Sequence, residues 1–202
     1  GKKADMVFTD PPYGMNLDTD YTKMGKTKIQ SKTYDKVVGD DVDFDASFLF
    51  EFFGYCDEIF LWGGDWYYPT LPPNGSWFVW DKRTEASDGL TGNHFEMIWS
   101  KQRHRRRIIR QLWSGFTARN DDTKRVHPTE KSVKVLSIVI GDYSKDGNMI
   151  VDVFGGSGST LIACEQLNRI CYMMELDPKY CDVIIKRWEN LTGQKAVLNG
   201  EV

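Results

Sequence analysis

The tetrad Asp10-Pro11-Pro12-Tyr13 combines a carboxylate, a restricted backbone and an aromatic ring directly after a short apolar run. The exocyclic amino group of a nucleobase is a weak nucleophile because its lone pair is delocalised into the ring. A carboxylate and a backbone carbonyl that accept its hydrogens would draw it toward tetrahedral geometry and free the lone pair. Pro12 has no N–H that could draw the carbonyl of Pro11 into a local helix, and both prolines restrict the backbone. Tyr13 offers a face on which an extruded base can stack. Taken alone, the tetrad is also typical of an ordinary turn.

A glycine-rich loop far along the sequence has features of a cofactor site. Glycines after a buried strand let a ligand approach the backbone, and the free N–H groups at a helix start favour a negative group. Glu175 lies 20 residues after Gly155, where a carboxylate at the end of the next strand can accept hydrogen bonds from a ribose diol. The loop matches neither the dinucleotide fingerprint, nor the serine-hydrolase elbow, nor the Walker A motif. It therefore predicts a site for a nucleoside-containing cofactor, with a tight turn that binds no ligand as the alternative.

These two segments need a sheet that brings them to the same edge. Apolar runs alternate with helical patterns, which predicts an α/β fold with a mostly parallel twisted sheet and helices on both faces. The expected strands cover residues 4–9, 58–62, 76–80, 95–99, 149–154, 169–175 and 195–198. The expected helices cover residues 47–55, 130–142, 159–168 and 178–192, and residues 21–38 are expected to form a long loop. In such a sheet the tetrad and the glycine loop both follow the carboxyl ends of strands, where open α/β sheets bind ligands.

A third segment, His127-Pro128-Thr129-Glu130-Lys131, precedes the strand that leads to the glycine loop. With DPPY and FGGSG, this segment makes the sequence resemble the DNA amino-methyltransferases that use S-adenosylmethionine. In that family DPPY is the catalytic motif, the glycine loop binds the cofactor, and the HPT(Q/E)K segment helps to bind its methionine end. The order of the motifs, with the catalytic motif first, is similar to the permuted β group and to its phage and prophage members. The resemblance covers nearly the whole chain and implies a Rossmann-like methyltransferase fold.

The resemblance also implies a role for each motif residue. Asp10 would accept the amino hydrogen and orient the attacking nitrogen, and Pro11, Pro12 and Tyr13 complete the catalytic motif. The residues implied in binding S-adenosylmethionine are Phe154, Gly155, Gly156, Ser157, Gly158, Ser159, Thr160 and Glu175, together with Thr129, Lys131 and Asp10. No metal is expected, because the sulfonium charge already activates the methyl group.

The charge distribution predicts a polyanionic partner. The net charge is −3, but residues 82–131 hold 12 basic and 6 acidic side chains, so that the basic residues are concentrated in one segment. Arginine binds phosphates and guanine edges, and the expected DNA contacts are Arg103, Arg105, Arg106, Arg107 and Arg110. We expect residues 82–126 to form a small DNA-recognition insert within a single domain over residues 1–202. A basic edge strand that prevents aggregation is the alternative.

Together these features predict a methyltransferase that acts on the N6 of an adenine flipped out of double-stranded DNA. Adenine is favoured because DPPY accompanies N6 in the family more often than N4 of cytosine. The alternatives are a cytosine-N4 methyltransferase, an enzyme that methylates RNA or a protein amide, and a DNA-binding module without turnover. No apolar stretch approaches the roughly 20 residues that cross a bilayer, and the four cysteines lack metal-site spacing. We expect a cytoplasmic protein of a bacterial or phage-infected cell, with dimerisation left open.

Overall fold

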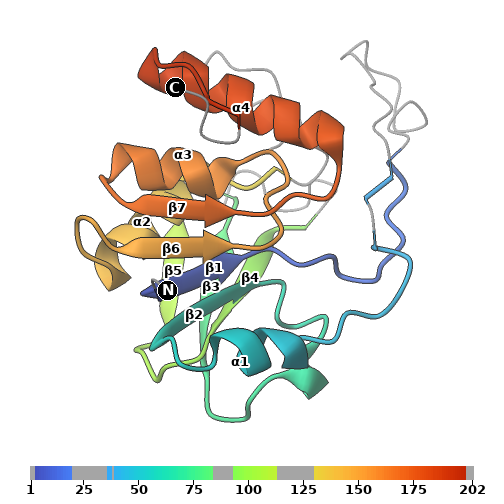
Figure 1. Ribbon diagram of the computed structural model, residues 1–202. Helices are drawn as coiled ribbons and strands as arrows, with labels where there is room; N and C mark the ends of the chain where they lie inside the picture. The colour runs from blue at the N-terminus through green and yellow to red at the C-terminus, as the bar shows by residue number, and fades with distance from the viewer. Residues whose placement is uncertain (1–2, 20–35, 38, 84–92, 113–129, 199–202) are drawn as a thin grey trace.

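One mixed sheet forms the centre of the computed structural model, which describes residues 3–19, 36–37, 39–83, 93–112 and 130–198. Within these ranges seven strands are hydrogen-bonded in the order β5-β3-β4-β2-β1-β6-β7 (Figure 1). The strands are β1 (Met6–Thr9), β2 (Glu58–Trp62), β3 (Ser76–Asp81), β4 (Phe95–Ser100), β5 (Arg107–Arg110), β6 (Met149–Asp152) and β7 (Ile170–Met173). Only β4 runs antiparallel to its neighbours among the described strands, so the prediction of a mostly parallel sheet is confirmed.

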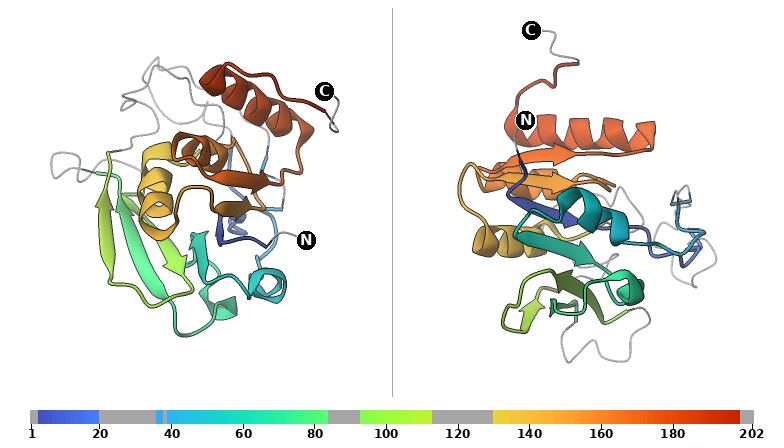
Figure 2. Two further views of the ribbon diagram at one scale, coloured as in Figure 1. Left: turned by 60° about the vertical axis from the view of Figure 1, so that its left-hand side comes forward. Right: turned by 60° about the horizontal axis from the view of Figure 1, so that its bottom comes forward.

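Helices cover both faces of the sheet, as the sequence predicts (Figure 2). They are α1 (Ser47–Phe53), α2 (Val133–Tyr143), α3 (Ser159–Gln166) and α4 (Pro178–Thr192), with a short 3-10 turn η2 (Tyr68–Thr70). Successive residues of a strand point to opposite faces. On one face Phe8 of β1 packs with α2 and α3, and on the other Val7 packs with α1. All four residues of β1 are buried, and three apolar residues precede Thr9. A run of this kind is typical of a parallel strand that is covered on both faces. No described helix is long and apolar enough to cross a membrane.

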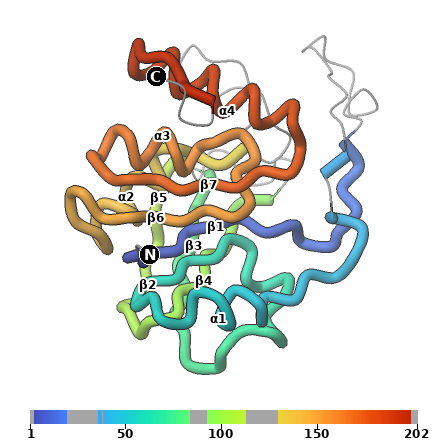
Figure 3. Tube along the Cα trace, viewed as in Figure 1, coloured from blue at the N-terminus to red at the C-terminus, as the bar shows by residue number. Residues whose placement is uncertain are grey.

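The register of the central strands positions the candidate site. Met6 of β1 lies opposite Ile150 of β6, and Val7 lies opposite Val151. Because β1, β6 and β7 are parallel, their carboxyl ends lie at the same edge of the sheet, where the chain leaves each strand in the same direction (Figure 3). The tetrad that follows β1 therefore lies next to the glycine loop that follows β6.

Four details differ from the sequence predictions. Helix α2 begins at Val133 rather than at residue 130, because Glu130, Lys131 and Ser132 are buried outside the helix and Ser132 has extended backbone angles. Residues 195–198 form no strand. Strand β5 was not among the strands expected from the apolar pattern, since only one of its residues is buried. It lies at the edge of the sheet, which agrees with the alternative of a basic edge strand. Strands β4 and β5 lie within residues 82–126 and extend the main sheet, so the described part of the expected insert is continuous with that sheet. Most of the expected loop over residues 21–38 lies outside the described residues.

Candidate active site

The last residue of β1 joins the tetrad to the start of the glycine loop. The Thr9 hydroxyl donates to Oδ1 of Asp152 at 2.6 Å. The same hydroxyl oxygen accepts hydrogen bonds from the backbone N–H groups of Val153 and Phe154, each at 3.2 Å. Thr9 and Asp152 are both buried. The structure thus brings the two predicted segments together and links them by side-chain hydrogen bonds.

Both carboxylate oxygens of Asp10 already have partners. The Tyr13 hydroxyl donates to Oδ1 at 2.8 Å, and the Lys131 ammonium lies 2.8 Å from Oδ2. Lys131 also donates to the Tyr13 hydroxyl at 3.1 Å, and its Nζ lies 5.5 Å from the centre of the Trp62 ring. Burial raises the pKa of Asp10 above its ordinary value, although the positive charge of Lys131 opposes that rise. The structure therefore places Lys131 at the tetrad of residues 10–13.

Two residues that sequence reasoning missed extend this charged cluster. Oε1 of Glu96 forms an ion pair with Lys82, and Oε2 lies 3.4 Å from Nζ of Lys131. Burial disfavours the charge of Glu96, but the two lysines outweigh it and lower the pKa of this carboxyl. Burial also disfavours the charge of Lys131, but Asp10 and Glu96 outweigh it and raise the pKa of this ammonium group. An acidic residue inside the otherwise apolar strand β4 was the only sequence signal for this pair.

The backbone of Tyr13 is bound in a turn by Asp40, and Gly63 leaves space for its ring. The ring lies nearly parallel to that of Trp66, with 6.1 Å between centroids and 7° between planes. Gly63 has a φ of +63°, and a Cβ there would lie 2.2 Å from the Tyr13 ring, so this position requires glycine. The carboxylate of Asp40 accepts hydrogen bonds from the N–H groups of Tyr13 at 3.0 Å and Leu17 at 2.9 Å. The pKa of Tyr13 is well above its ordinary value, mainly because the hydroxyl is buried.

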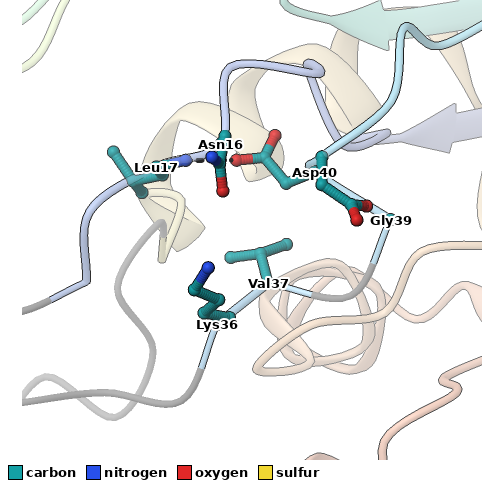
Figure 4. Close-up of a pocket in the computed structure, with 7 residues that line it drawn as sticks. Asn16, Leu17, Lys36, Val37, Gly39 and Asp40 are labelled. Carbon is teal, nitrogen blue, oxygen red and sulfur yellow. Dashed lines mark hydrogen bonds between the residues drawn. The ribbon is translucent and has the colours of Figure 1, made fainter.

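A pocket of about 330 Å³ lies beside this turn (Figure 4). It is lined by Asn16, Leu17, Lys36, Val37, Gly39, Asp40 and Asp41. Among the residues that the structure describes, none of the predicted site residues lines it. Its wall is the turn stabilised by the Asp40 carboxylate, which accepts the Leu17 N–H. The pocket is therefore connected to the tetrad through the backbone of that turn.

The glycine loop and Glu175 meet as the spacing predicts. The N–H of Gly156 donates to Oε2 of Glu175 at 2.6 Å, and the N–H of Asp177 donates to Oε1 at 2.9 Å. Gly156 and Gly158 have φ values of +51° and +80°, which glycine adopts at little cost. A Cβ at Gly155 would lie 2.7 Å from the side chain of Met173. Glu175 thus lies directly beside the loop.

Arg187 of α4 holds the other side of the loop, and sequence reasoning did not identify it. Its Nη1 donates to the backbone carbonyl of Ser157 at 2.6 Å and to the Ser157 hydroxyl at 2.8 Å. Its Nη2 lies 3.3 Å from Oε1 of Glu130. Ser159 and Thr160 are buried at the start of α3. The predicted cofactor residue Thr129 lies outside the described residues.

Phe154 packs against an aromatic ring from the turn before α1. The Phe44 and Phe154 rings meet edge to face, with 5.6 Å between centroids. Phe44 makes a similar contact with Tyr67, which is buried in the core. Core packing is therefore one function of Phe154.

The predicted DNA-binding arginines lie along the β5 edge of the sheet. Arg103 donates to the side chain of Asn74 at 2.8 Å, Arg107 is ion-paired with Asp142, and Arg110 lies 3.7 Å from Asp81. Because β5 is parallel to β3, the chain reaches β5 from the amino-terminal end of these strands. The structure therefore places Arg103, Arg105 and Arg106 at the end of the sheet opposite Asp10, and Arg110 toward the Asp10 end.

Part of the chain is similar in sequence to a known methyltransferase. The curated type II methyltransferase M.EcaI of Enterobacter cloacae is 29% identical over 119 residues, which are 53% of this chain and 25% of that protein. The chain thus spans about a quarter of the length of that relative.

Two solved structures share the fold. The PvuII DNA methyltransferase (cytosine-N4-specific) superposes with a TM-score of 0.59 at 12% identity, covering 99% of this chain and 81% of that one. The M1.HpyAVI–SAM complex superposes with a TM-score of 0.56 at 17% identity, covering 92% and 89%. The family model of the DNA methylases matches residues 76–187, more than half of the chain. The chain belongs to the DNA methylase family.

Proposed function

We propose that the protein transfers a methyl group from S-adenosylmethionine to the N6 amino group of an adenine flipped out of double-stranded DNA. The observation that carries this proposal is the junction at Thr9, which links the strand that ends at Asp10 to the strand that ends at the glycine loop. Membership of the DNA methylase family supports the reaction class. The cofactor is supported by the M1.HpyAVI–SAM complex, whose fold this chain shares.

The described residues of the loop fit a nucleoside. Each oxygen of Glu175 accepts one backbone N–H, and a carboxylate oxygen has a second lone pair with which it could accept a ribose hydroxyl. The left-handed glycines bring the backbone close to that space. We assign the cofactor to Phe154, Gly155, Gly156, Ser157, Gly158, Ser159, Thr160 and Glu175, with Thr129, Lys131 and Asp10 at its methionine end.

The described residues at the tetrad suit the transfer itself. Asp10 and the carbonyl of Pro11 accept the amino hydrogens, so that the nitrogen lone pair points at the methyl carbon. S-adenosylmethionine, when bound, supplies a methyl group that its sulfonium charge has already activated. The nitrogen–carbon bond forms as the carbon–sulfur bond breaks, and the electron pair of that bond stays on sulfur. The methylated nitrogen then releases its extra proton to the Asp10 carboxylate and from there to water. Positioning and exclusion of water supply the catalysis.

Base extrusion costs a few kcal/mol, and stacking offsets part of that cost. The near-parallel rings of Tyr13 and Trp66 offer aromatic surface at the tetrad for an extruded base. DNA is the proposed partner, and Arg110 is the predicted contact that lies toward the Asp10 end of β5. The DPPY motif favours adenine. The PvuII enzyme, which has the same fold, is cytosine-N4-specific, so cytosine N4 is the second candidate target.

The experiment is incubation with methyl-tritiated S-adenosylmethionine and unmethylated duplex DNA, followed by digestion to nucleosides and chromatography. We expect label in N6-methyladenine. Label in N4-methylcytosine would select the second candidate, whereas label in RNA or protein, or cofactor binding without any transfer, would refute the proposal. Asp10→Ala should abolish transfer and largely spare cofactor binding, since the glycine loop and Glu175 remain, and Glu51→Gln on the exposed face of α1 serves as the matched control.

A further inference from the structure

The Lys131 ammonium occupies the position at Asp10 that the proposed reaction needs for the target amino group. Its Nζ lies 2.8 Å from Oδ2 of Asp10, while the Tyr13 hydroxyl binds Oδ1. An N–H donated to a carboxylate oxygen is the same type of contact that the amino group would make. When the target base enters, Lys131 and the base compete for Asp10.

Lys131 needs another anionic partner if it is to leave Asp10. Its side chain is only 8% exposed, and a buried ammonium group without a partner is strongly disfavoured. Among the described side chains Oε2 of Glu96 is that partner, in addition to the methionine carboxylate to which Lys131 is assigned when the cofactor is bound. This oxygen is buried and accepts no hydrogen bond from the described part of the chain, although it lies 3.4 Å from Nζ of Lys131. A small shift of the ammonium group would turn this contact into a hydrogen bond.

The ion pair at Oε1 of Glu96 determines how strongly Glu96 attracts the Lys131 ammonium group. Oε1 is ion-paired with Lys82, which follows β3 and whose Nζ lies 4.9 Å from the centre of the Trp80 ring. The four side chains thus alternate in sign along one line of contacts from Asp10 to Lys82. Their net charge is zero whether Lys131 is bound to Asp10 or to Glu96, so the shift buries no additional charge.

We propose that Glu96 is a positioning residue for methyl transfer, because it receives the Lys131 ammonium when the target amino group binds Oδ2 of Asp10. Lys82 weakens the attraction between Glu96 and the Lys131 ammonium group, because it shares the negative charge of Glu96. No covalent bond changes in this step, and no proton moves. The inference rests on the proposed function of Asp10 as the acceptor for the amino group.

Two substitutions should shift the pH dependence of catalysis in opposite directions. Glu96→Gln removes the competing anion, so Lys131 stays on Asp10, stabilises its ionised form and obstructs the amino group. Lys82→Met leaves Glu96 with Lys131 alone, so Lys131 is drawn from Asp10 and the ionised form of Asp10 is less stable. The groups that act electrostatically on Asp10 or on its partners in this cluster are Lys131, Lys82, Glu96, Tyr13, Tyr67, Asp65 and Asp152.

The test is the pH profile of single-turnover methyl transfer at saturating S-adenosylmethionine and unmethylated duplex DNA. For Glu96→Gln we expect the acid limb to move down by about one pH unit and the plateau rate to fall by roughly tenfold or more. For Lys82→Met the acid limb should move up. Glu96→Asp, which keeps the charge, should restore much of the plateau rate, and Glu51→Gln should match the wild type.

A merely structural role for Glu96 predicts a different pattern, in which both variants lose rate and their acid limbs stay in place or move together. That result, or an unaltered Glu96→Gln profile, would overturn the inference even if Asp10→Ala shows that the proposed function holds. Absence of any transfer by the wild type would instead refute the proposed function. If circular dichroism shows that Glu96→Gln is unfolded, the direction of the Lys82→Met shift decides.

Discussion

Asp152 should make the stability of the fold depend on pH in a way that one substitution removes. Its carboxyl group is buried at the end of β6, where Oδ1 accepts hydrogen bonds from the Thr9 hydroxyl at 2.6 Å and from the N–H of Phe154 at 3.1 Å. Burial raises the pKa of Asp152 from 3.8 to about 7, although hydrogen bonds from Thr9 and Thr160 oppose the rise. The neutral acid is therefore favoured in the folded protein through the weakly acidic range.

The direction follows from proton binding in the two states. Below pH 3.8 both states hold the proton, and between pH 3.8 and about 7 only the folded state retains it. Because the folded state then binds more protons, the free energy of unfolding falls as pH rises, and the fall is complete above the folded pKa. One pKa unit corresponds to about 1.4 kcal/mol, so the full effect is about 4 kcal/mol, of which about 2 kcal/mol falls between pH 5 and 7.

Asp152→Asn tests this value, because asparagine retains the Oδ1 acceptor for Thr9 and cannot ionise. Urea unfolding of both proteins at pH 5, 6, 7 and 8 gives the difference in their free energies of unfolding. Groups that titrate equally in both proteins cancel in that difference. We expect the difference to shift in favour of the variant as pH rises, and to level off above pH 7. A difference that stays constant with pH would show that burial does not hold Asp152 in its neutral form.

Three further substitutions test the close contact at the glycine loop, the free space at a glycine of α2 and the hydrogen bond of Thr9. Gly155→Ala should lower the free energy of unfolding by about 1–3 kcal/mol, because the new Cβ would lie 2.7 Å from Met173; equal stability in thermal unfolding would contradict the close packing of the loop. Gly141→Ala, in helix α2 with no neighbour closer than 4.0 Å, should raise stability by roughly 0.5–1 kcal/mol. Thr9→Val removes the hydroxyl at the junction and should cost about 1–3 kcal/mol, measured by urea unfolding; a smaller loss at pH 5 than at pH 8 would agree with a neutral Asp152 at low pH.

Some elements could be predicted to the residue because their signals are local. Helix α4 begins after Asp177, whose carboxylate accepts the Lys179 N–H at 2.9 Å, and Pro178 is its first residue. Its C-cap, Gly193, has a φ of +71°. Strand β2 is an apolar run preceded by Glu58 in the middle of the sheet, and its bounds also agree with the prediction. In each case the residues that define the element are contiguous in the sequence.

Other elements depend on distant parts of the chain. Strand β5 buries only Ile109 well and pairs with β3 at the edge of the sheet. Its sequence alone indicates an edge strand only as an alternative to a DNA-binding segment. The expected strand over residues 195–198 is not part of the described sheet. For a short segment, the presence of a partner outweighs the intrinsic strand propensity.

The same distinction applies to the site. The tetrad, the glycine loop and Glu175 could be predicted because motifs and spacing identify them. Glu96, Lys82 and Arg187 could not, since each reaches the site from an element with no recognisable motif. Their contacts depend on the order of strands in the sheet and on the packing of α4, which only the three-dimensional structure shows.

The late start of α2 explains how one segment serves both halves of the site. Glu130 pairs with Arg187, which binds the glycine loop through Ser157, while Lys131 pairs with Asp10. Residues 130–131 thus join the two halves of the site at a second point, in addition to the hydrogen bonds of Thr9.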